Sequence, residues 1–235
     1  MTRRETLGVA IGTGGLALTL VLFASGHLDE QIQWLFFDSA GGGWVFPERD
    51  NLWRPVFYTW PKTALYVLAG CLFLVWSASF FAERVVRYRL AAFYLLACLA
   101  LVPLAANGLK AVTNIACPSE VAPFSGNLPH VGLFEPYPPG TADGRRFRCW
   151  PAGHASGGFA LLGLGFLGFS RRVWIGFLPG LAVGWTMGLY QMAKGVHFLS
   201  HTLVTMFGAL LICALLSVLA RRLADRLGLK GQAGF

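Results

Sequence analysis

The chain has 235 residues, of which 55% are hydrophobic and only 13% are charged, and it carries a formal net charge of +8. A soluble domain of this length needs far more charge on its surface, so the composition excludes an ordinary water-soluble protein. The positive charge would suit a nucleic-acid binder, but the basic residues lie at the ends of apolar blocks, where they orient a membrane protein. We therefore expect the lipid bilayer, and no nucleic acid, as a partner.

Six apolar blocks divide the chain, and each approaches the roughly 20 residues that a helix needs to cross a bilayer core about 30 Å thick. The fourth block is shorter than the others and rich in glycine. We expect an all-α bundle of six transmembrane helices that forms a single membrane-embedded domain over residues 1–235. The predicted spans are approximately residues 6–26, 63–81, 90–109, 153–169, 174–192 and 198–220.

The basic residues predict the orientation of these spans. The two termini, the loop at 83–89 and the turn at 170–172 hold eleven Lys/Arg and three Asp/Glu, whereas the opposite side receives eight of each sign. An excess of Lys and Arg is typical of cytoplasmic segments. We therefore expect a multi-pass protein of the bacterial inner membrane, with both termini cytoplasmic and the long polar segments facing the periplasm.

Polar side chains gather at the predicted outer ends of the spans. Lys110 closes the third span, His154 opens the fourth, and a polar turn joins the fifth span to the sixth. His197 and His201 in this region are four residues apart, so on a helix they would share a face. One imidazole can act as a nucleophile and a second can protonate a leaving alkoxide. These residues predict a reaction centre at the outer membrane surface.

The same clusters suit a phosphoryl group. Lys110, Lys194 and an arginine of the 145–148 run, such as Arg148, could neutralise its charge. Gly153 would let backbone amides approach an anion closely. A helix that starts near His154 would also turn its positive end toward phosphate.

The order and spacing of these motifs resemble the type 2 phosphatidic acid phosphatase and vanadium haloperoxidase superfamily. Its signature reads Lys-x6-Arg-Pro, Pro-Ser-Gly-His and Ser-Arg-x5-His-x3-Asp, and the resemblance covers roughly residues 110–205. The corresponding segments here are Lys110-x6-Cys117-Pro118, Pro151-Ala152-Gly153-His154 and Tyr190-Gln191-x5-His197-x3-His201. A divergent bacterial membrane branch is similar in having Cys-x-Pro-Ala-Gly-His-Ala-Ser and Arg-Gly-x-His-Phe-x-Ser-His. This chain has Cys-Trp-Pro-Ala-Gly-His-Ala-Ser at 149–156 and Lys-Gly-Val-His-Phe-Leu-Ser-His at 194–201.

The resemblance implies a reaction and a role for each matching residue. His197 would attack phosphorus and form a phosphohistidine, His154 would protonate the leaving oxygen, and Lys110 would hold the phosphate. The expected substrate is a membrane lipid (di)phosphate of the isoprenoid, phosphatidyl or lipid A type, with no metal and no other cofactor.

The chain departs from the family signature at three positions. Cys117 and Gln191 stand where the family has phosphate-binding arginines, and His201 stands where an aspartate orients the nucleophile. Lys194 and Arg148 are candidates for the missing positive charges. The candidates for the missing carboxylate are Glu120, Glu135 and Asp143.

Two other functions remain open from the sequence. A non-catalytic lipid-phosphate binder or transporter could retain this scaffold after losing the arginines. A metal protein could use His154, His197 and His201, although no carboxylate or cysteine lies at ligand spacing with them.

Structural roles also compete with the chemical ones. Lys110 and Lys194 could extend toward lipid headgroups, and His201 could form a hydrogen bond between helices. Cys117 and Cys149 both lie in segments predicted to face the oxidising compartment, and each flanks a motif. We predict a disulfide between these two cysteines, with free thiols as the alternative.

Overall fold

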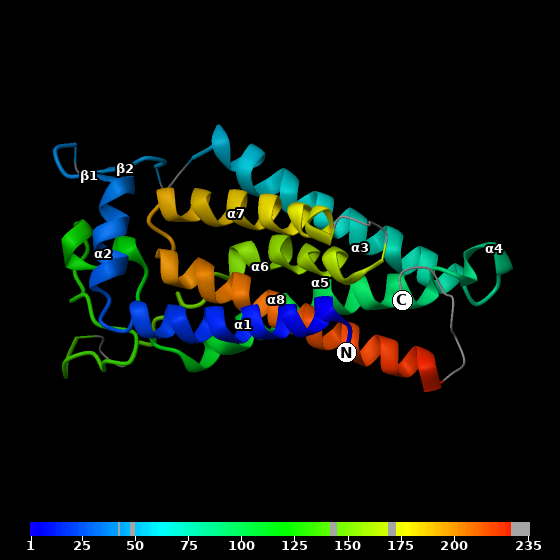
Figure 1. Cartoon of the computed structure of the whole chain (residues 1–235). Coiled ribbons are helices and arrows are strands. Elements are labelled where there is room, and N and C mark those ends of the chain that lie inside the picture. Colours follow the sequence, from blue (N-terminus) through cyan, green and yellow to red (C-terminus); the bar gives the residue numbers. More distant parts are fainter. Residues whose placement is uncertain (42, 48–49, 142–144, 169–172, 227–235) are drawn as a thin grey trace.

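The computed structural model describes residues 1–41, 43–47, 50–141, 145–168 and 173–226. Over these ranges the chain is mostly helical (Figure 1). The α-helices are α1 (Arg3–Leu22), α2 (His27–Gln33), α3 (Trp60–Ala78), α4 (Glu83–Val86), α5 (Arg89–Val112), α6 (Gly153–Ala160), α7 (Leu178–Ala193) and α8 (Leu199–Arg226). The shorter elements are η1 (Trp34–Phe36), η2 (Pro55–Thr59), η3 (Pro118–Glu120), η4 (Ala122–Phe124), η5 (Leu161–Phe166), η6 (Val173–Phe177) and the hairpin of β1 (Phe37–Asp38) and β2 (Gly43–Trp44).

Within the described ranges, four helical segments are long and apolar enough to cross a membrane. They are Arg3–Leu22, Pro55–Ala78, Arg89–Val112 and Leu199–Arg226, and they overlap the first, second, third and sixth predicted spans. The fourth predicted span contains only the eight residues of α6 before the chain tightens into the 3-10 helix η5. The fifth is composed of η6 and the 16-residue α7. The six-span topology therefore stays a prediction.

Glycines let the backbones of α6 and α7 lie close together. A Cβ atom on Gly158 of α6 would lie 2.7 Å from the backbone nitrogen of Gly184 in α7, and one on Gly180 of α7 would lie 2.4 Å from the backbone nitrogen of Leu162 in η5, which continues α6. Side chains at these positions would separate the two backbones. The glycines that weaken helix propensity thus permit the close packing at the centre of the bundle.

Helices α1 and α8 run side by side in opposite directions (Figure 1). The buried carboxylate of Glu5 accepts hydrogen bonds from the Ser217 hydroxyl and the Arg221 guanidinium, each at 3.0 Å. The beginning of α1 and the end of α8 lie at one end of the bundle, while α2 and the hairpin lie at the other (Figure 1). This arrangement agrees with termini on a common side, and the cytoplasmic placement of that side stays a prediction.

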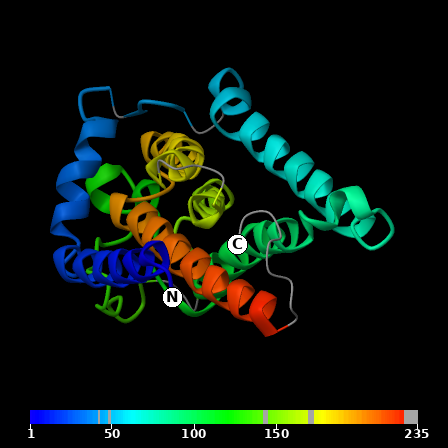
Figure 2. The same ribbon diagram turned by 45° about the vertical axis from the view of Figure 1, so that its right-hand side comes forward.

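Helix α3 stands apart from the rest of the bundle and packs mainly on α5 (Figure 2). None of its residues is buried, and apolar side chains such as Leu74, at 68% exposure, face outward. Such a surface is unusual in a water-soluble protein and suits contact with lipid.

The segments at the far end of the bundle form a small apolar layer above the start of α8. Phe37 of the hairpin, Phe124 of η4 and Phe147 of the segment before α6 pack together with Phe198. This layer fixes the loops around the turn between α7 and α8, where the predicted histidines lie.

Candidate active site

Three histidines from separate elements form a chain of close contacts. His154 lies in the first turn of α6, His197 precedes α8, and His201 lies in the first turn of α8. The Nδ1 atom of His154 is 3.0 Å from Nε2 of His197, and Nδ1 of His197 is 3.4 Å from Nδ1 of His201. His197 and His201 are each 1% exposed, whereas His154 is half-buried. His154 thus separates the two buried imidazoles from the outside.

The surroundings of His197 favour its neutral form. Burial lowers the pKa of its imidazole well below the usual range, and His201, His154 and Lys110 act in the same direction. Removing a charge from water is costly, and nearby positive groups add to that cost. His197 therefore retains an unprotonated nitrogen at neutral pH, as a nucleophile requires.

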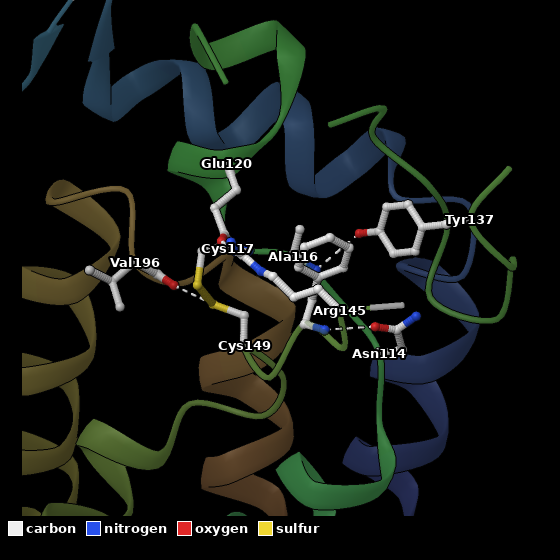
Figure 3. Close-up of polar contacts among 9 residues, drawn as sticks. Asn114, Ala116, Cys117, Glu120, Tyr137, Arg145, Cys149 and Val196 are labelled. Carbon is white, nitrogen blue, oxygen red and sulfur yellow. Dashed lines mark hydrogen bonds and ion pairs between the residues drawn. A yellow bond between two sulfur atoms is a disulfide. The ribbon is translucent and has the colours of Figure 1, made fainter. Parts of the chain in front are cut away.

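Cys117 and Cys149 form a disulfide (Figure 3) that lies close to this histidine. It joins the segment after α5 to the segment before α6, across a sequence separation of 32 residues. The Cys149 sulfur is 2.7 Å from the carbonyl oxygen of Val196 and 3.6 Å from Nδ1 of His197. Because a disulfide sulfur carries no hydrogen, these are packing contacts that limit where the His197 ring can lie.

Polar contacts hold the disulfide segments in place (Figure 3). Glu120 accepts a hydrogen bond of 2.9 Å from the Cys117 amide and forms an ion pair with Arg145. The Ala116 amide donates to the Tyr137 hydroxyl at 3.0 Å. Glu120 is therefore engaged away from the histidines and does not supply the missing carboxylate.

A cavity of about 390 Å³ opens between α3, α5 and α6, next to His154. Its volume lies within the range typical of small-ligand pockets. Its polar lining residues are Tyr58, Lys62, Tyr66, Asn107, Lys110, His154 and Ser156, and its apolar lining residues are Leu65, Ala69, Leu99, Pro103 and Met187. Asn107 and Lys110 lie near the C-terminal end of α5 and Leu99 and Pro103 lie earlier in this helix, so the lining changes from polar to apolar along α5. The cavity therefore suits a molecule with an ionic head and an apolar tail.

Lys110 and Gly153 meet at the polar end. A Cβ atom on Gly153 would lie 3.2 Å from Cε of Lys110 and 3.3 Å from the Asn107 amide oxygen. The glycine thus makes room for the half-buried lysine at the first turn of α6, where free backbone N–H groups favour an anion.

The other predicted phosphate ligands lie away from this cavity. Gln191 is buried in α7, and its carbonyl accepts the Val196 amide at 2.9 Å. Lys194 has its Nζ atom 5.6 Å from the ring centroid of Tyr190, at the end of α7. Arg148 is exposed on the loop before α6. Among the described residues that line the cavity, none is Gln191, Lys194 or Arg148.

A buried carboxylate from α2 lies at the beginning of α8, beside the histidine turn. Asp29 is buried and accepts hydrogen bonds from the amide of Ser200, at 2.9 Å, and from its hydroxyl. It thereby caps the beginning of α8, one residue before His201. Burial raises the pKa of Asp29 to about 7, although the two Ser200 hydrogen bonds act to lower it.

The carboxylates expected from the sequence are engaged elsewhere or not described. Glu135 accepts the Gly132 amide at 2.9 Å, and Asp143 lies outside the described residues. Sequence reasoning missed Asp29, whose only signal was an acidic residue in an aromatic segment. It also missed Lys62, whose signal was a cation near the start of an apolar helix.

A possible metal cluster contains Cys149, His197 and His201, whose ligand atoms lie within 4.8 Å of one another. Cys149 is disulfide-bonded, so its sulfur is not a thiolate and is a poor metal ligand. The donors that remain are imidazoles arranged in a row. This arrangement suits proton transfer better than tetrahedral coordination.

A family model described as the PAP2 superfamily matches residues 91–224, which include nearly all of α5, the whole of α6 and α7, most of α8 and all three histidines. No match was found among curated proteins or among solved structures.

Proposed function

This chain belongs to the PAP2 superfamily, and we propose that it removes or transfers the phosphoryl group of a lipid (di)phosphate at the periplasmic face of the inner membrane. The family match supports phosphatase or phosphotransferase action on phosphate esters. The lipid substrate, the phosphohistidine intermediate and the membrane side are the additional parts of the proposal.

The polarity gradient of the cavity is the observation that carries the choice of a lipid. Lys110 and His154 lie at its polar end, and Leu99 and Pro103 lie farther from that end along α5. A phosphate headgroup would meet the lysine and the beginning of α6, while the chain of the lipid would lie between α3 and α5. A soluble phosphate ester would leave the apolar end unfilled.

In the proposed reaction, Nε2 of His197 attacks phosphorus and the bond to the leaving alkoxide breaks. His154 gives its proton to that alkoxide, so the first product leaves as an alcohol or a shorter phosphate. Water then attacks the phosphohistidine, His154 accepts the proton of the water, and phosphate leaves. Another acceptor hydroxyl in place of water would make the reaction a transfer.

The hydrogen bond between His154 and His197 must break before this attack, because it occupies Nε2 of the nucleophile. His154 is half-buried at the cavity wall, and a rotation of its side chain would give phosphorus access to His197. A phosphate oxygen would replace the lost partner. In this proposal His201 and the disulfide hold the His197 ring in position during the exchange.

The experiment is a phosphate-release assay on purified protein with isoprenoid, phosphatidyl and lipid A phosphates. We expect turnover of at least one lipid by the wild type and loss of turnover in His197→Ala. His27→Ala is the matched control, because His27 is exposed and is not among the residues that line the cavity. Undiminished release by His197→Ala would rule out this residue as the nucleophile.

A lipid-phosphate binder or transporter is the second candidate. The two signature arginines, which bind phosphate in the family, are replaced here by Cys117 and Gln191. Cys117 is in a disulfide and Gln191 is buried away from the cavity, so neither supplies a positive charge for catalysis, and this loss favours a binder. Measured affinity for lipid phosphates without phosphate release from any member of the panel would support this candidate over the enzyme.

The proposed topology has six spans with both termini in the cytoplasm. It is supported by the charge asymmetry and by the common end of the bundle at which α1 begins and α8 ends (Figure 1). Labelling of single cysteines at position 2 and at position 127 with a membrane-impermeant reagent tests it. We expect labelling from the periplasm at position 127 alone.

A further inference from the structure

We propose that Lys62 of α3 is a second phosphate-binding residue of this cavity. The inference rests on the proposed function and adds a ligand that the family match does not assign, because the matched region starts at residue 91. Lys62 would form the wall opposite Lys110 around the headgroup.

The first argument is position. Lys62 and Lys110 come from different helices and line the polar end of the same cavity, together with His154. A phosphate in contact with His154 would therefore lie within the field of both ammonium groups.

The second argument is charge. A phosphate monoester carries nearly two negative charges at neutral pH. Of the two positions at which the family signature has arginine, Cys117 lies in a disulfide and Gln191 is buried in α7. Lys110 alone would leave much of the phosphate charge unbalanced. Lys62 forms no ion pair with any described carboxylate, so its charge can act on a ligand.

The third argument is the way in which Lys62 is held. Tyr58 of η2 lies one turn before Lys62 and Tyr66 of α3 lies one turn after it, and the Lys62 Nζ atom is 5.6 Å and 5.7 Å from their ring centroids. The Tyr58 ring is in turn 5.4 Å from the His154 ring. Lys62 is exposed, and the two rings flank its ammonium group through cation–π contacts without covering it. The two rings keep the ammonium group at the cavity mouth, beside the proposed acid.

The test compares Lys62→Ala and Lys62→Arg with the wild type in the lipid-phosphate assay. Loss of a charge-assisted contact should raise both KM and the inhibition constant of inorganic phosphate about tenfold or more. Arginine should restore a large part of both values, because it keeps the positive charge. Arg87→Ala is the matched control, because Arg87 also stacks on a tyrosine, with its guanidinium 4.7 Å from the Tyr88 ring centroid, but lies outside the cavity lining.

Equilibrium dialysis of radiolabelled inorganic phosphate against the same variants separates this inference from the proposed function. Wild-type KM and phosphate affinity in a folded Lys62→Ala protein would overturn the role of Lys62 and leave the enzyme proposal intact. A wild type that binds phosphate through Lys62 but releases none from lipids would overturn the enzyme and keep the site. Thermal midpoints of all variants establish that each is folded.

Discussion

The Nδ1 atom of His154 lies 3.0 Å from the Nε2 atom of His197, and of this pair only His154 reaches the cavity. In the proposed mechanism the group that protonates the leaving oxygen thus covers the attacking atom until a ligand arrives. The same contact would also permit His154 to be the nucleophile and His197 its base. The two assignments predict different effects of His154→Ala on kcat for substrates whose leaving groups do or do not need a proton.

His154→Ala should discriminate between substrates by leaving group. If His154 is the general acid, the variant should lose about 10²–10⁴-fold in kcat on a lipid phosphate with an alkoxide leaving group. It should lose far less on p-nitrophenyl phosphate, whose leaving group needs no proton. Steady-state kinetics on both substrates gives the comparison, and an equally large loss on both would identify His154 as the nucleophile.

Removal of the disulfide should affect both stability and turnover. Cys117→Ser with Cys149→Ser opens a link across 32 residues, which should cost about 2–4 kcal/mol of folding free energy. It also removes the sulfur that lies 3.6 Å from Nδ1 of His197, so kcat should fall even where the protein remains folded. Thermal unfolding and phosphate release measure the two effects.

Cys71→Ser, which removes an exposed free thiol, is the matched control for the disulfide variant. An unchanged thermal midpoint and an unchanged kcat in the double variant would contradict a structural and positioning role for the disulfide.

Asp29 should make stability depend on pH near neutrality. Burial raises its folded-state pKa to about 7, well above the unfolded value near 4, so the native protein binds the proton more tightly. The stabilising contribution is complete below about pH 4 and is lost as pH rises to about 7. As pH rises from about 4 to about 7, the thermal midpoint of the wild type should therefore fall relative to that of Asp29→Asn, whose amide does not titrate. Parallel midpoint curves would refute the raised pKa.

Gly195 should tolerate no side chain. Its φ of +69° favours glycine, and a Cβ atom there would lie 2.2 Å from the Trp44 ring. Gly195→Ala should cost about 1–3 kcal/mol and displace the turn that carries His197, with loss of turnover. Gly208→Ala in α8 is the control, because its Cβ would meet open space and alanine favours a helix. Equal stability of the two variants in thermal unfolding would contradict the predicted strain.

The sequence by itself determined the helical class, the apolar blocks and the family. These properties depend on the composition, on the length of each apolar block, and on short motifs such as the one that contains His154. Each can be recognised without knowing which segments lie side by side.

Only the tertiary structure decided which side chains share the site. Lys62 reaches the cavity because α3 packs on α5, and Asp29 caps α8 because α2 folds across the end of the bundle. The same packing kept Gln191 and Arg148 away from the cavity that the sequence had assigned to them. Such choices depend on contacts between residues far apart in the chain, whose energies come from burial and close fit. A linear pattern of residue types does not contain that information.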